Sequence, residues 1–96
     1  MNFRLDSDPV TGVWLVRFGV RASVWFDCWG MITGHVCSVR EDRQFRATAL
    51  RLLREAAVTA RMEAVPRGRF GRAGSEVRRR FLARVVELAV EREAKL

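Results

Sequence analysis

Residues 13–26 read Val-Trp-Leu-Val-Arg-Phe-Gly-Val-Arg-Ala-Ser-Val-Trp-Phe, and this stretch predicts two adjoining β-strands. The first half, Val13–Phe18, is rich in β-branched and aromatic residues, which favour strands. After Gly19, apolar residues recur at every second position up to Phe26, which is the period of a strand with one buried face. We therefore expect an antiparallel sheet that extends outward from this stretch.

The flanking segments add further strands to the expected sheet. Before it, Phe3 and Leu5 alternate with polar residues, and residues 7–12 have the Asp, Pro and Gly content of a tight turn. After it, residues 28–39 predict one or two more strands, interrupted near Gly30 and Gly34. The N-terminal third, residues 1–38, is therefore expected to be a sheet of three or four strands.

The remaining two thirds predict two helices. A capping box of the form S-x-x-E at Ser38–Glu41 starts a helix over residues 39–65, which ends before Pro66. A basic, Gly-rich loop over 66–74 leads to Ser75, the expected N-cap of a second helix over 75–96. The expected fold is α+β in a single domain, residues 1–96, with an antiparallel sheet packed against two antiparallel C-terminal helices.

Bulk composition indicates an ordinary globular chain. It has 96 residues, of which 49% are hydrophobic and 30% charged. Its N-terminal residues lack the apolar core of a signal peptide, and no apolar run approaches the ~18–20 residues that span a bilayer. Two cysteines are too few for a disulfide scaffold. These features predict a cytoplasmic protein with no membrane association.

Positive charge is concentrated in one part of the sequence. The net charge is +7, and residues 67–80 contain six arginines against the single acid Glu76, which accounts for five of those seven charges. Such an excess predicts a negatively charged partner. Phe70 adds an aromatic ring that can stack on a base. The alternative is a solvated loop in an arginine-rich chain. The candidate binding residues here are Arg67, Arg69, Phe70, Arg72, Arg78, Arg79 and Arg80.

Two further candidates lie elsewhere. Helical spacing brings Arg40, Arg43, Arg51, Arg54 and Arg61 to one face of the first helix, where they can contact an acidic partner or remain a solvated face. Alternation in the third strand places Trp25 on the side opposite Val24 and Phe26. Trp25 is therefore either an exposed interface anchor or covered by another element.

The residue pattern gives little indication of metal binding or catalysis. Cys28, His35 and Cys37 offer three ligands where structural zinc takes four, so we interpret the cysteines as buried thiols. No motif of a hydrolase, a metalloprotease or a phosphate-binding loop is present. We expect no enzyme activity, no cofactor and no metal.

The expected function is binding. In size and composition, without any shared motif, the chain resembles small phage and mobile-element inhibitors such as anti-CRISPR proteins. That resemblance implies a non-enzymatic inhibitor that occupies an acidic surface on a protein or nucleoprotein partner. The alternative is direct, sequence-independent binding of DNA or RNA. An exposed sheet edge could also pair two copies into a homodimer.

Overall fold

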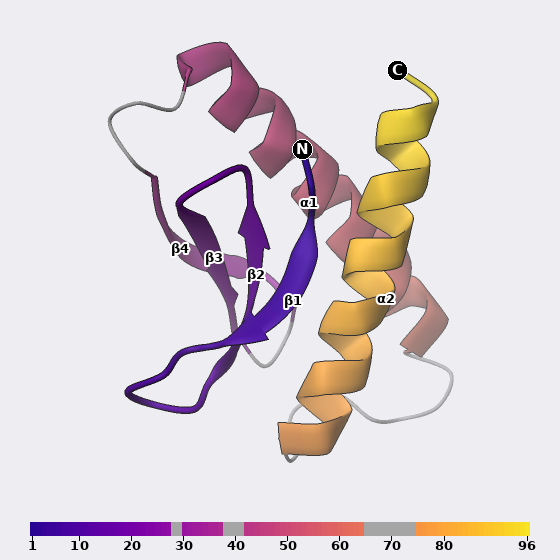
Figure 1. Cartoon of the computed structure of the whole chain (residues 1–96). Coiled ribbons are helices and arrows are strands. Elements are labelled where there is room, and N and C mark those ends of the chain that lie inside the picture. Colours follow the sequence, from indigo (N-terminus) through magenta and orange to yellow (C-terminus); the bar gives the residue numbers. More distant parts are fainter. Residues whose placement is uncertain (28–29, 38–41, 65–74) are drawn as a thin grey trace.

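A four-stranded antiparallel sheet is followed by two long helices (Figure 1). The computed structural model describes residues 1–27, 30–37, 42–64 and 75–96. The expected α+β fold is confirmed. The elements are β1 (Arg4–Ser7), β2 (Trp14–Phe18), β3 (Ala22–Phe26), β4 (Ile32–Val36), α1 (Arg43–Ala64) and α2 (Ser75–Ala94).

The strands are ordered β1-β2-β3-β4, so each one pairs with its neighbour in sequence. Turn chemistry explains the first hairpin. The carboxylate of Asp8 accepts a bond from the Val10 N–H, and the Asp8 carbonyl accepts one from Gly12. Gly12 has φ +72°, a conformation that costs glycine little. The turn expected over residues 7–12 is thus present.

Both helices cover the same face of the sheet (Figure 1). The core between these layers joins Val16, Phe18 and Val24 of the sheet to Leu53 of α1 and Leu82 of α2, all of them fully buried. These positions follow the period of two in the strands and of about 3.6 in the helices. The apolar faces expected from the sequence therefore form the core.

The start of α1 differs from the expectation. The helix begins at Arg43, four residues later than predicted, and the Ser38–Glu41 capping box lies outside the described residues. Asp42 is the N-cap, because its carboxylate accepts bonds from the N–H groups of Gln44 and Phe45. An aspartate that satisfies two otherwise unbonded N–H groups fixes the start of the helix here.

The start of α2 also needs a correction. Ser75 is the first helical residue rather than the N-cap. Its hydroxyl accepts a bond of 3.0 Å from the indole N–H of Trp14 and so links α2 to β2. The helix ends at Ala94.

Ion pairs show that the two helices run antiparallel, as expected. Arg84 of α2 contacts Glu63 near the end of α1, at 2.9 Å. Two turns further along α2, Arg92 contacts Glu55, which lies two turns earlier in α1. The carboxylate partners of Arg84 favour its charged form and raise the pKa of its guanidinium, the Glu63 hydrogen bond most of all.

Candidate functional site

Arginines 78–80, which the sequence marks as candidate binding residues, are partly engaged within the protein. Arg78 is half-buried, and its Nη1 donates a hydrogen bond to the backbone carbonyl of Phe26, at the end of β3. Arg79 forms a two-pronged contact with the carboxylate of Glu76, and Arg80 reaches the same carboxylate at 3.5 Å. One acid therefore offsets part of the charge of this triplet.

The pKa values of this cluster reflect the same contacts. The hydrogen bond from Arg79 holds the pKa of Glu76 below its ordinary value of 4.5, with help from the charges of Arg79 and Arg80. The same hydrogen bond raises the pKa of Arg79. Arg80 remains 72% exposed, so it is the member of the triplet that is best placed to contact another molecule.

The contact made by Arg78 belongs to a larger junction between the β3–β4 connection and both helices. Gly30 is buried and has φ +77°, and the side chains of Phe81 and Arg61 lie directly against it. Arg61 Nη1 also lies 3.2 Å from the sulfur of Met31. The end of α1 and the beginning of α2 are therefore both fixed to the same turn of the sheet.

A second group of arginines is not engaged in this way. Arg43, Arg51 and Arg54 lie on the outer side of α1 and are exposed. No carboxylate within the described parts of the chain forms an ion pair with any of them. The sequence expectation of an arginine face on this helix is met at these three positions, whereas Arg61 lies against the β3–β4 connection and Arg40 lies outside the described residues.

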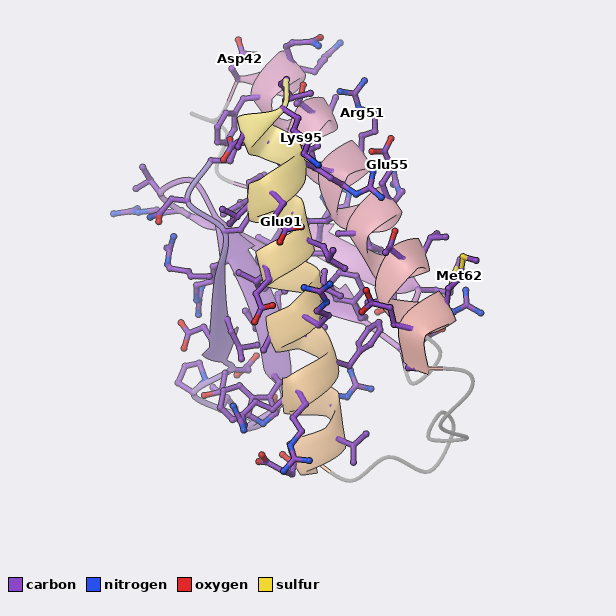
Figure 2. All side chains as sticks on the ribbon, turned by 90° about the vertical axis from the view of Figure 1, so that its right-hand side faces the viewer. Asp42, Arg51, Glu55, Met62, Glu91 and Lys95 are labelled. Atoms are coloured by element: carbon purple, nitrogen blue, oxygen red, sulfur yellow. The ribbon has the colours of Figure 1, made fainter. Side chains whose placement is uncertain are left out.

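Two exposed apolar side chains extend the same side of α1. Val58 is 53% exposed and Met62 is 70% exposed, and both follow Arg54 at intervals of four residues. Figure 2 shows Arg51 and Met62 pointing outward from α1. We call Arg43, Arg51, Arg54, Val58 and Met62 together the cationic face of α1. Sequence reasoning missed its apolar part, although the four-residue spacing was visible.

The two carboxylates of α1 form ion pairs with α2 and not with the outer arginines. Glu55 and Glu63, the acids of the helix, form ion pairs with Arg92 and Arg84 of α2. Both carboxylates nevertheless remain exposed, and Glu55 lies one turn after Arg51 and next to Arg54, so it offsets part of their charge as well. The three outer arginines outnumber this carboxylate, so the outer side of α1 keeps an excess of positive charge.

Trp25 lies on the sheet face that the helices leave uncovered. It is half-buried, and alternation puts it on the same side of the sheet as Arg17 and Ser23. Arg17 is held there by Asp6, at 2.6 Å, and it donates a bond to the Ser23 hydroxyl. The expected orientation of Trp25 is confirmed, but its exposure is intermediate between the two alternatives.

The other expected site residues fall in parts of the chain that the structure does not describe. These are Arg67, Arg69, Phe70 and Arg72 of the basic loop. Cys28 lies outside as well, whereas Cys37 is half-buried against the core and His35 is exposed. Across the described ranges, no three histidine, cysteine or carboxylate side chains lie close enough together to hold a metal ion.

Neither of the two described helices is long and apolar enough to cross a membrane. Comparisons with protein-family models, with curated proteins and with solved structures found no match for this chain. The candidate site therefore rests on the contacts described above, and the cationic face of α1 is the surface that they single out.

Proposed function

We propose that the protein is a non-enzymatic binding protein that occupies an acidic surface of a protein or nucleoprotein partner through the cationic face of α1. The observation that supports this function is the lack of any described carboxylate partner for the exposed Arg43, Arg51 and Arg54. Planar guanidinium groups suit carboxylates, to which they can donate two parallel hydrogen bonds.

The apolar part of the face favours a protein surface over bare nucleic acid. Burying Val58 and Met62 against a partner would contribute about 25 cal/mol for each Å² of apolar surface removed from water. Phosphates offer no apolar surface in return. Arginine and methionine are moreover enriched in protein interfaces. From Arg43 to Met62 the face is about 29 Å long at a rise of ~1.5 Å per residue.

The mode of action that fits this surface is inhibition by occupancy. A chain of this kind, of the size of phage and mobile-element inhibitors, would block whatever the acidic surface of its partner normally binds. We place this activity in the cytoplasm, where such partners are found. The basic segment 66–74 follows α1 closely in sequence and would add charge to the same interaction.

A pair of matched double variants tests the proposal. One combines Arg51→Gln with Arg54→Gln on the cationic face of α1. The other combines Arg21→Gln with Lys95→Gln, two exposed basic residues outside that face. Both variants lose two positive charges. We expect the first to elute from immobilised polyglutamate at clearly lower salt than the second. If the two elute together, net charge alone governs retention and the proposal is wrong.

Direct binding of DNA or RNA is the second candidate, because a row of unpaired arginines can also follow a phosphate backbone. It predicts that log K for duplex DNA falls with log salt by about 0.9 for each phosphate contacted. Met62→Gln separates the two functions. It weakens binding to a protein partner but leaves DNA binding unchanged. Capture from a host lysate with and without nuclease then shows which class of partner is retained.

A further inference from the structure

β4 is an edge strand of the sheet, with β3 on one side and no strand of the described chain on the other. Thr33, His35 and Val36 are exposed, and Val36 is 60% exposed. An edge strand presents backbone N–H and C=O groups that have no partner within the sheet. Within the described residues, no backbone group outside the sheet bonds to β4.

The two edges of the sheet are protected very differently. β1, the opposite edge, carries Arg4 and Asp6 and lies beside α2 (Figure 1). Ionic side chains on an edge strand discourage pairing with a foreign strand. β4 carries none, and it lies within residues 28–39, the longest stretch of the sequence without Asp, Glu, Lys or Arg. β4 is therefore the edge that lacks this protection.

We propose that a second copy of this chain pairs with β4, strand against strand and antiparallel. Two copies that each carry a charge of +7 repel one another, so they can approach closely only where neither surface is charged. Of the two edge strands, β4 is the one that itself carries no Asp, Glu, Lys or Arg. Val36 supplies an exposed apolar side chain for the interface to bury. Antiparallel pairing of identical strands is two-fold symmetric and closed, so it stops at a dimer.

The dimer would also determine where the helices of the two copies lie relative to each other. Antiparallel edge pairing joins two sheets about an axis perpendicular to them, so both pairs of helices lie on the same face of the joined sheet. The two cationic faces of α1 would then belong to one assembly. Such an assembly gains affinity for a partner with repeated acidic sites, because the second contact becomes intramolecular.

Sedimentation equilibrium over a wide range of protein concentration tests the pairing. We expect a reversible monomer–dimer equilibrium for the wild type and a monomer for Val36→Lys, in which a lysine enters the edge. Val10→Lys is the matched control, because it adds the same charge at a position 91% exposed in the β1–β2 turn. It should dimerise like the wild type, and circular dichroism should show that both variants are folded.

Hydrogen exchange adds a readout specific to the strand. Amides of residues 32–36 should become more protected as the protein concentration rises, whereas those of β1 should not change. The inference is overturned if the wild type stays monomeric at the highest concentration, or if the two lysine variants behave alike. It is also overturned if protection rises in β1 rather than in β4. None of these results bears on whether the cationic face of α1 binds an acidic partner.

Discussion

Replacing Gly30 with alanine should destabilise the protein more than the same replacement at Gly12 or Gly34. An ideal Cβ at Gly30 would lie 2.6 Å from Cζ of Phe81 and 3.0 Å from Cγ of Arg61. Because real Cβ atoms do not approach other atoms so closely, the Phe81 ring must move. The backbone adds a second penalty, since φ is +77°.

Gly12→Ala is a control that separates the backbone penalty from the steric penalty of Gly30→Ala. Its φ of +72° is nearly the same, but nothing lies within 4 Å of an added Cβ. The left-handed conformation costs an L-residue roughly 1–2 kcal/mol in either variant. Overpacking around Phe81 adds about 1–3 kcal/mol in Gly30→Ala alone. The lower entropy of the unfolded chain with alanine is common to both and cancels in the comparison.

Urea unfolding followed by circular dichroism measures the difference between the two variants. A loss of 1 kcal/mol lowers the melting temperature of a domain of this size by roughly 4–8 °C, so the two variants should also separate clearly on heating. Equal losses for Gly30→Ala and Gly12→Ala would mean that the β3–β4 connection does not pack closely on Phe81. The junction described above would then be incorrect.

Three further changes test other contacts. Asp42→Ala should lower the free energy of unfolding by about 1 kcal/mol in urea denaturation, because two N–H groups of α1 lose their acceptor. Arg78→Met should lower the free energy of unfolding by about 1.5–3 kcal/mol, because the hydrogen bond to the Phe26 carbonyl is lost. Arg80→Met should have the stability of the wild type within error, because this side chain is exposed. Equal losses in the two variants would contradict the view that Arg78 supports the fold and Arg80 does not. Arg17 holds the pKa of Asp6 below its ordinary 3.8, so this carboxylate stabilises the fold above that pH and loses its effect as the pH falls through the lowered value. Asp6→Asn should therefore be less stable than the wild type at neutral pH, and a gap that fails to close in strong acid would refute this assignment.

Periodicity was sufficient to predict the layers of the fold. The alternation that ends at Val24 and Phe26, and the helical spacing of Leu53 and Leu82, place these side chains in one core. The start of α1 was not predictable in the same way. Ser38 and Asp42 are both good N-cap residues, and local sequence does not decide which of them accepts the N–H groups.

The candidate site was predicted only in outline. Helical spacing was enough to bring Arg51 and Arg54 to one exposed face, because that depends on local geometry alone. The role of Arg78 depends on the carbonyl of Phe26, which is 52 residues away in sequence. A contact of that range is set by how α2 lies on the sheet. A count of charges therefore overestimated how many arginines are available to a partner.

The packing of the helices also determines which charges face the solvent. Arg84 and Arg92 reach across to Glu63 and Glu55, so the two acids of α1 form ion pairs with α2 and not with the outer arginines of α1. Exposed ion pairs of this kind contribute little to stability by themselves. Their larger effect is on the distribution of charge, because they concentrate the excess of positive charge on the side of α1 that faces away from α2. The pairing of Glu63 and Glu55 with α2 therefore leaves Arg51 and Arg54 without an ion-pair partner in the described chain and available to another molecule.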